Sequence, residues 1–356
     1  MPLVALISAI AVSFIVAALL IPAIIRAGHK YRILDLPGQH KRHKEPTPLL
    51  GGVALFVTTW LTVAIGYLLF YDLYQELSST VVYIFLGGLI ILLVGLSDDL
   101  KPLSAWIKLL AQVAAGLLLY LGGLRVMLLS IPFQAVNVDI GPFSVVITVA
   151  WVVILTNAIN LIDGLDGLAS GVSLIGALCL LVIGQLYQVG AVLVFVLILI
   201  GFLSLFLWYN RYPARIFLGD SGSMQIGYYF AVFSLTIPLK SYTATALYVP
   251  LLALGVPLME VLSSMVRRLV RGQSIMQADR RHLFHYLSLI GFSRRQVVVI
   301  FYSMATAYGL FALAMFYWDR LIVFGTLIFF MVVIFAVFFI LLTKFSLRRK
   351  LNGRRE

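Results

Sequence analysis

Apolar runs of about 20 residues recur along the whole chain, and they constrain the fold more than any other feature. An α-helix needs about 20 such residues to cross the hydrocarbon core of a bilayer. The runs are continuous rather than alternating, which disfavours a β-barrel. The predicted spans are 3–26, 49–71, 81–97, 105–121, 144–161, 168–187, 189–208, 222–238, 244–266, 296–317 and 321–343. The sequence therefore predicts an all-α polytopic membrane protein with about eleven transmembrane helices.

Composition supports this class, because 62% of the residues are hydrophobic and only 11% are charged. Soluble domains average about 25% charged residues, and a globular core cannot absorb this much apolar surface. We interpret residues 1–356 as a single integral-membrane domain without a soluble unit. The predicted cytoplasmic segments are loops near 27–48, 98–104, 162–167, 209–221 and 267–295, and a basic tail, 344–356.

The basic residues indicate an orientation. With the N-terminus outside and the C-terminus cytoplasmic, 23 of the 26 Lys and Arg residues fall in cytoplasmic segments. The positive-inside rule requires such a bias. The formal charge of +12 is therefore a signal of topology and of contact with anionic lipid, and requires no nucleic acid. We expect a multi-pass protein of the cytoplasmic (inner) membrane.

Acidic residues concentrate on the same predicted face. Eight of the 14 lie in inner loops or at inner helix ends: Asp35, Glu45, Asp98, Asp99, Asp163, Asp166, Asp220 and Asp279. Carboxylates at membrane depth are costly and usually functional. Helices that are distant in sequence thus bring carboxylates to one depth, the cytoplasmic interface.

The stretch NAINLIDGLDGLAS, residues 157–170, interrupts the apolar pattern most strongly. Asn157, Asn160, Asp163 and Asp166 are spaced three apart, and a glycine follows each aspartate. We expect a helix to carry the two asparagines inward and to unwind at Asp163, because non-helical backbone at this depth must line protein or water. A polar helix–helix contact is the alternative.

These residue types favour one chemistry. Carboxylate and amide oxygens suit Mg²⁺, which retains water and joins substrate phosphates. Arg, Lys and His side chains suit phosphate oxygens. Together they predict a site for Mg²⁺-dependent phosphate transfer on the cytoplasmic face. Alternatives remain for single motifs, since Asp220 also suits a helix N-cap and His282 a solvated loop.

Four motifs resemble the polyprenyl-phosphate N-acetylhexosamine-1-phosphate transferase family. VGLSDDL, NAINLIDGLDGLA, FLGDSGS and DRRHLFH occur in the order found in that family, and the resemblance covers essentially the whole chain. The stretches DLPGQHKRHKEPTP and DRRHLFH look most like the branch that uses UDP-GlcNAc. The resemblance implies that undecaprenyl phosphate attacks the β-phosphate of UDP-GlcNAc, and that UMP leaves. The lipid-diphosphate sugar would start cell-envelope polysaccharide synthesis, such as that of lipopolysaccharide or teichoic acid.

The resemblance also implies roles for individual residues. Asp220 and Asn160 would hold Mg²⁺, or Mn²⁺ in its place. Asp98 and Asp99 would position the lipid phosphate or its metal, with a base role left open. The remaining implied contacts are Lys108, Arg280, Arg281 and His282 with the diphosphate, Asp166, Asn210 and Phe217 with uridine, and Lys41, Arg42 and His43 with the lipid phosphate or the sugar. Asn157 and Asp163 are assigned to substrate binding or to holding the bend.

Two positions depart from the family pattern. Pro102 stands where the family often has a third Asp or Asn, so Lys101 or water must fill that role. Phe284 replaces the middle histidine of the DRRHLFH motif. Other donors remain open, including the UDP-MurNAc-pentapeptide translocase reaction. A more distant alternative is an ion-coupled transporter, which would place its carboxylates near the bilayer midplane. The sequence does not decide between a monomer and a homodimer.

Overall fold

The computed structural model describes residues 3–36, 45–71, 78–130, 137–187, 193–240, 252–270, 283–319, 321–323 and 325–330. Long helices dominate these residues, and seven of them are long and apolar enough to cross a membrane. The prediction of an all-α polytopic membrane protein is confirmed. The count of about eleven spans and the orientation stay predictions.

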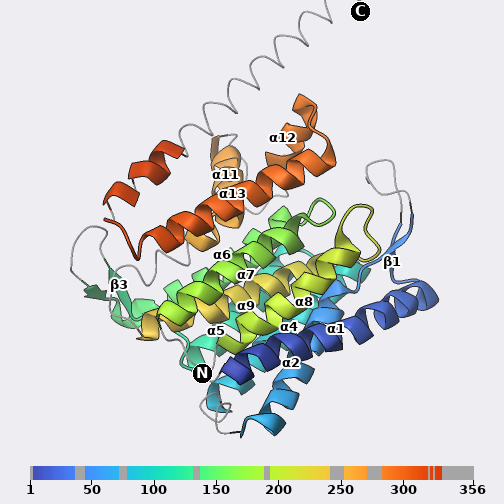
Figure 1. The fold of residues 1–356 in the computed structure, drawn as a ribbon, viewed down its shortest axis with the longest axis horizontal. Helices are drawn as coiled ribbons and strands as arrows, with labels where there is room; N and C mark the ends of the chain where they lie inside the picture. The colour runs from blue at the N-terminus through green and yellow to red at the C-terminus, as the bar shows by residue number, and fades with distance from the viewer. Residues whose placement is uncertain are drawn as a thin grey trace, which may run out of the picture.

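The helices follow the predicted apolar runs (Figure 1). They are α1 (Leu3–Tyr31), α2 (Gly51–Leu69), α4 (Ser78–Leu100), α5 (Ala105–Leu121), α6 (Ser144–Ile162), α7 (Leu168–Leu186), α8 (Leu193–Asn210), α9 (Gly219–Lys240), α11 (Gly255–Val270), α12 (Leu283–Ile290) and α13 (Arg294–Ala314). A 3-10 turn, Gly141–Phe143, precedes α6. Two short antiparallel pairs complete the described elements: β1 (Leu34–Asp35) with β2 (Thr47–Pro48), and β3 (Leu128–Ser130) with β4 (Asn137–Asp139).

Several helix ends differ from their predicted positions. Helix α4 continues to Leu100, so Asp98 and Asp99 lie in its last turn rather than in a loop. Helix α9 begins at Gly219 instead of residue 222, and α11 runs to Val270 instead of residue 266. The short helix α12 was not predicted, because it is too short to produce a spanning apolar run. Most of the predicted span 321–343 lies outside the described residues.

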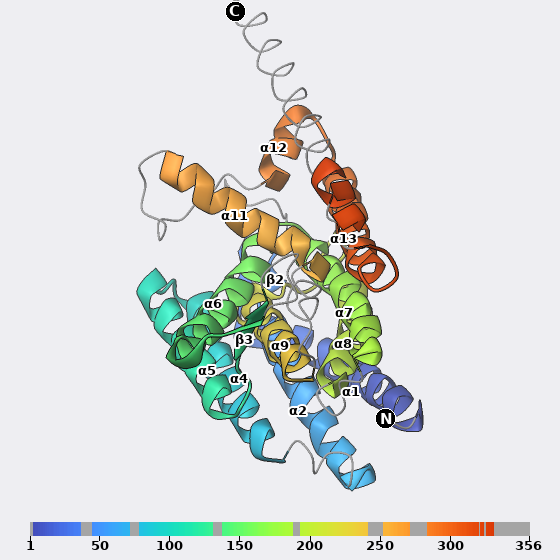
Figure 2. The same ribbon diagram turned by 90° about the vertical axis from the view of Figure 1, so that its left-hand side faces the viewer.

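Helix α9 is the centre of the bundle. It packs against α2, α4 and α6, and Figure 2 shows it enclosed by them and by α7 and α8. Every residue from 221 to 236 is buried. Gly52 of α2 and Gly95 of α4 lie against the backbone of Ser221 so closely that a Cβ at either position would overlap it. Small residues allow this approach between membrane helices, and here they fix the start of α9.

The C-terminal helices lie on one side of this bundle (Figures 1 and 2). Helix α13 packs along α7, and α11 packs against both α6 and α13. A capping box at Ser293 starts α13, with Gln296 as its reciprocal partner. This packing brings α12 against the turn between α6 and α7, where Phe284 contacts Gly164.

Candidate active site

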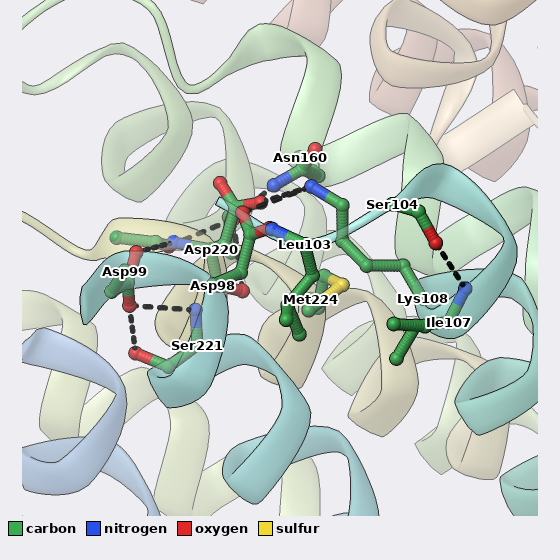
Figure 3. A network of polar contacts seen from close by, with 12 residues as sticks. Asp98, Asp99, Leu103, Ser104, Ile107, Lys108, Asn160, Asp220, Ser221 and Met224 are labelled. Atoms are coloured by element: carbon green, nitrogen blue, oxygen red, sulfur yellow. Dashed lines mark hydrogen bonds and ion pairs between the residues drawn. The ribbon is translucent and has the colours of Figure 1, made fainter. Parts of the chain in front are cut away.

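Lys108 joins two of the predicted carboxylates. Its Nζ lies 3.0 Å from Asp98 Oδ2 and 2.7 Å from Asp220 Oδ2 (Figure 3). The Lys108 and Asp220 side chains are 26% and 29% exposed, so the pair is open to a ligand. Helices α4, α5 and α9 each supply one of the three groups. The ammonium group offsets the repulsion between the two carboxylates, which would otherwise oppose their approach.

The short link between α4 and α5 sets this geometry. The Leu103 N–H donates to Asp98 Oδ1 at 2.7 Å. Ser104 caps α5, because its side chain accepts from the Ile107 N–H. Lys108 therefore lies in the first turn of α5, where it reaches Asp98 across the link. Pro102, where the family often has Asp or Asn, lies inside this link and is exposed.

Asp99 holds the start of α9. Its Oδ1 accepts from the Asp220 N–H at 2.7 Å, and its Oδ2 accepts from the N–H and the hydroxyl of Ser221 at 3.1 and 2.7 Å. A carboxylate is favoured at a helix N-terminus, where backbone N–H groups lack helical partners. Gly219 has φ +68°, and a Cβ there would lie 2.5 Å from Asp99 Oδ2. Asp99 thus positions Asp220, while its predicted contact with the lipid phosphate stays a prediction.

The two asparagines of α6 have different surroundings. Asn160 Nδ2 donates to Ser223 Oγ at 3.0 Å, one turn of α9 beyond Asp220. Figure 3 shows Asn160 among the residues of the same polar network as Asp220 and Lys108. Asn157 Nδ2 instead donates to Gln112 Oε1 at 2.7 Å, and Gln112 is buried. Asn157 therefore links α6 to α5, and no described contact tests its predicted role in substrate binding.

The chain unwinds between α6 and α7, as the glycines predict. Helix α6 ends at Ile162 and α7 begins at Leu168, with Gly167 at φ +78°. Asn210 is buried, and its Oδ1 accepts from the Gly167 N–H while its Nδ2 donates to the Ile216 carbonyl. The Tyr302 hydroxyl donates to the Gly167 carbonyl at 2.6 Å. Asn210 thus fixes the turn from its buried position, and its contact with uridine stays a prediction.

Asp163 lies at this turn as the C-cap of α6. Burial raises the pKa of its carboxyl well above the ordinary value, and the negative charges of Asp220, Asp99 and Asp166 raise it further. Among the described residues, no hydrogen bond or ion pair compensates its side chain. A cation or a proton at Asp163 would relieve this repulsion, which distinguishes it from Asp98 and Asp220.

Asp166 and Phe217 belong to neighbouring loops. Asp166 Oδ2 accepts from the Ala214 N–H at 3.1 Å, which ties the α6–α7 turn to the α8–α9 loop. The Phe217 N–H donates to the Pro48 carbonyl at 2.9 Å, and the Phe217 carbonyl accepts from the Gly51 N–H at 3.0 Å. These backbone contacts dock the α8–α9 loop on the start of α2. They do not test the predicted contacts with uridine.

The predicted diphosphate loop and first loop are only partly covered. Lys41, Arg42, His43, Arg280, Arg281 and His282 lie outside the described residues. The adjoining helix α12 is fixed by Glu260, which is buried and accepts from the Leu283 N–H at 3.1 Å. Phe284 is buried against Gly164, and its ring lies 4.2 Å from the ring of His285.

Sequence reasoning had missed the positioning roles of Glu260 and Phe284. The signals for them were a carboxylate inside an apolar run and an apolar residue inside a histidine motif. Neither signal identifies the partner, because each contact joins segments that are distant in sequence. The departure at Phe284 therefore has a packing explanation.

Asp220 and Asn160 provide oxygen ligands of the kind that Mg²⁺ prefers. The Lys108 ammonium compensates the charges of Asp98 and Asp220 at this position. Within the described ranges, no group of three or more His, Cys, Asp or Glu side chains could hold a metal. The residues therefore fit a Mg²⁺ ion that takes most of its ligands from phosphate and water, as Mg²⁺ commonly does with nucleotides.

Comparison with known proteins agrees with this site. Residues 81–238 match glycosyl transferase family 4. The chain is 34% identical over 337 residues to the "probable undecaprenyl-phosphate N-acetylglucosaminyl 1-phosphate transferase" of Bacillus subtilis, which covers 92% of each chain. It is 34% identical to the decaprenyl-phosphate N-acetylglucosaminephosphotransferase of Mycobacterium tuberculosis, over 75% of this chain and 71% of that protein. It is 33% identical to the phospho-N-acetylmuramoyl-pentapeptide-transferase of Listeria monocytogenes, over 67% of this chain and 76% of that protein.

A polytopic helical membrane protein with carboxylates and a lysine gathered at helix ends is thus a glycosyl-phosphate transferase by class. The chain belongs to the polyprenyl-phosphate N-acetylhexosamine-1-phosphate transferase family. The resemblance based on the four motifs is confirmed.

Proposed function

We propose that the protein transfers N-acetylglucosamine-1-phosphate from UDP-GlcNAc to undecaprenyl phosphate. The main observation in support is the position of Lys108, whose partly exposed ammonium lies within 3.0 Å of carboxylates from two other helices. The names of the Bacillus and Mycobacterium relatives, both with an N-acetylglucosamine phosphate group and a polyprenyl phosphate, support this choice of substrates.

In this reaction an oxygen of the lipid phosphate attacks the β-phosphorus of UDP-GlcNAc. The bond between that phosphorus and the bridging oxygen breaks, and UMP leaves with the electron pair. A phosphate monoester is already mostly anionic near neutral pH, since its second pKa is about 6. The site therefore needs to position and neutralise phosphate groups more than it needs to remove a proton. Lys108 suits the neutralising role, and Asp99 keeps Asp220 in place.

Mg²⁺ is the proposed cofactor, with Mn²⁺ as a substitute. Asp220 and Asn160 would hold it, and the ion would supply charge neutralisation for the diphosphate. The support is the chemistry of these two oxygen ligands, together with the contact of Asn160 with Ser223, one turn of α9 beyond Asp220.

We propose the cytoplasmic membrane as the location, with the site on its cytoplasmic face. The bias of Lys and Arg toward one set of loops supports this orientation. The carboxylates lie at helix ends: Asp98 in the last turn of α4, Asp163 at the end of α6, and Asp220 in the first turn of α9. Positions at helix ends suit an interfacial enzyme better than a transporter with a midplane site.

Mass analysis of the product tests the proposal. Purified protein with UDP-GlcNAc, Mg²⁺ and undecaprenyl phosphate should yield UMP and a lipid carrying one added N-acetylglucosamine phosphate. Asp220→Ala should lose the product, and Asp319→Ala, an exposed carboxylate at the predicted outer face, should retain it. Product formation without any divalent ion would contradict the role of the metal.

A second donor has specific support from the Listeria relative, whose name describes transfer of phospho-N-acetylmuramoyl-pentapeptide. A panel of UDP-linked N-acetylhexosamines, including UDP-MurNAc-pentapeptide, separates the two choices. The proposal predicts the highest kcat/KM for UDP-GlcNAc. A higher value for the pentapeptide donor would replace it.

A further inference from the structure

A cavity of about 690 Å³ reaches the turn between α6 and α7. It is bounded by the end of α8, the loop that follows it, the start of α13 and the turn at Asp166–Gly167. Asp98, Lys108, Asn160 and Asp220 are not among the residues that line it. The cavity is therefore separate from the groups assigned to phosphate transfer, although its lining includes Asp166, which the family resemblance assigns to uridine.

Four arginines line this cavity: Arg211, Arg215, Arg294 and Arg295. Within the described part of the chain, none of the four forms an ion pair with a carboxylate. The single acidic residue in the lining is Asp166, and one of its oxygens is already bonded to the Ala214 N–H. Four guanidinium groups against one carboxylate leave a strong excess of positive charge, which favours an anionic ligand.

Two of the arginines are held by aromatic rings. The guanidinium carbon of Arg211 lies 3.5 Å from the centre of the Trp208 ring, and that of Arg294 lies 5.3 Å from the centre of the Tyr212 ring. Contact with a ring uses the face of a guanidinium group and leaves its N–H donors at the edge available. Such donors suit the oxygens of a phosphate, which accept several charge-assisted hydrogen bonds.

The rest of the lining is apolar and open to the surroundings. Val298 and Val299 of α13, Leu207 of α8 and Leu165 complete the walls. Trp208 and Val299 are 58% and 60% exposed. In a membrane protein, Trp and Tyr concentrate where the hydrocarbon meets the headgroups. A cavity that joins arginines to an exposed apolar wall at this level suits a ligand with a phosphate and an acyl chain.

We propose that this cavity binds the phosphate headgroup of an anionic membrane phospholipid. A lipid bound in the cavity stabilises the turn between α6 and α7. Gly167 of this turn lines the cavity, and so does Tyr302, which donates to the Gly167 carbonyl. The binding part of this inference is independent of the proposed function, and only the effect on turnover rests on it.

Native mass spectrometry of the full-length protein tests the binding. After incubation with equal amounts of phosphatidylglycerol and phosphatidylcholine, the protein should retain phosphatidylglycerol in preference. Arg294→Gln/Arg295→Gln should lower this retention about tenfold, since each lost charge-assisted hydrogen bond weakens the complex. Arg26→Gln/Lys30→Gln removes two exposed charges from α1, outside the cavity, and should leave retention unchanged. Arg211→Gln/Arg215→Gln provides a second disruptive pair if the first variant does not fold.

Competition experiments distinguish a phospholipid headgroup from the phosphate groups of the two substrates. If undecaprenyl phosphate or UDP-GlcNAc displaces the bound phosphatidylglycerol, the cavity is a substrate subsite and the proposal is overturned. Equal retention of the two phospholipids, or full retention in both arginine variants, overturns it as well. Persistence of phosphatidylglycerol in the presence of both substrates supports it.

Turnover in liposomes gives the second readout. Vesicles of phosphatidylcholine with about one third phosphatidylglycerol should raise wild-type turnover several-fold over pure phosphatidylcholine, as anionic lipids attract basic sites. The arginine variants should show no rise. A complete absence of transfer in every vesicle would refute the proposed function and leave the binding result standing, whereas an equal rise in the variants would refute the coupling to the cavity.

Discussion

Asp98 and Asp220 differ from Asp163 in how their negative charges are compensated, although all three lie at helix ends. Asp98 and Asp220 share the Lys108 ammonium. Asp163 has no partner among the described residues, and its neighbours raise the pKa of its carboxyl. The Asp98–Lys108–Asp220 cluster has a compensated charge, as expected of the proposed phosphate-transfer site, whereas the charge of Asp163 has no such compensation.

Replacing Lys108 with methionine should have the largest effect. The two carboxylates would lose their shared cation, and the site would lose the group proposed to neutralise the diphosphate. We expect kcat to fall by about 100- to 1,000-fold, the scale of removing one strong electrostatic contact. Steady-state release of UMP measures it. Lys30→Met removes an exposed lysine from α1, outside the three helices that carry the cluster, and should keep near wild-type turnover.

Asp99→Asn should have an intermediate effect. The substitution places an NH₂ group where Asp99 now accepts hydrogen bonds from Asp220 and Ser221, so the start of α9 must shift. We expect a loss of about tenfold in kcat with little change in KM, because one buried acceptor is removed without changing a substrate contact. Ser97→Ala, at an exposed position two residues before Asp99 on α4, serves as the control. A rise in KM with kcat unchanged would instead indicate that Asp99 binds substrate.

Asp163→Asn should stabilise the metal-free protein in a pH-dependent way. A carboxyl whose pKa is raised by folding contributes stability below its ordinary pKa of about 4, and this contribution is lost as pH rises through the raised value. Asparagine does not ionise, so the melting temperature of the variant should exceed that of the wild type by an increasing margin, about 2–4 °C per kcal/mol recovered. Asp163→Glu keeps an ionisable group and should show no such gain. A pH-independent difference for Asp163→Asn would rule out charge repulsion as the cause.

Tyr302→Phe should have the smallest effect. It removes the hydrogen bond to the Gly167 carbonyl, which supports the turn from α13. We expect a loss of about 0.5–1.5 kcal/mol in stability, with a modest decrease in turnover. Thermal unfolding measures the loss of stability, and steady-state release of UMP measures the turnover. Tyr317→Phe alters an exposed ring outside the site and should match the wild type.

The sequence predicted the helices well where the determining interactions are local. The run 105–121 became α5 with the same bounds, and the glycines after Asp163 and Asp166 marked the break between α6 and α7. Apolar length and glycine content act within one segment, so a single sequence contains them.

Positioning roles were less accessible, because they depend on packing between distant segments. Asp99 and Ser221 are separated by 122 positions, and their contact requires α4 to pack against α9. The same packing moved the start of α9 from residue 222 to Gly219. Asn210 was assigned to uridine from its motif, yet its buried contacts with Gly167 and Ile216 are visible only in the folded chain. Motifs identify which residues gather, and packing decides what each one contacts.

A double-mutant cycle on Lys108 and Asp220 tests whether the two side chains act as one unit in phosphate transfer. The measurement is kcat for Lys108→Met, for Asp220→Ala and for the double variant, all in membranes of the same composition. If the two side chains act as one unit, kcat of the double variant should be about equal to kcat of the less active single variant. Once one member of a coupled pair is removed, removal of the other has little further effect. If the fold-losses in kcat of the two single variants multiply in the double variant, Lys108 and Asp220 act independently. That result would contradict their role as one phosphate-transfer site.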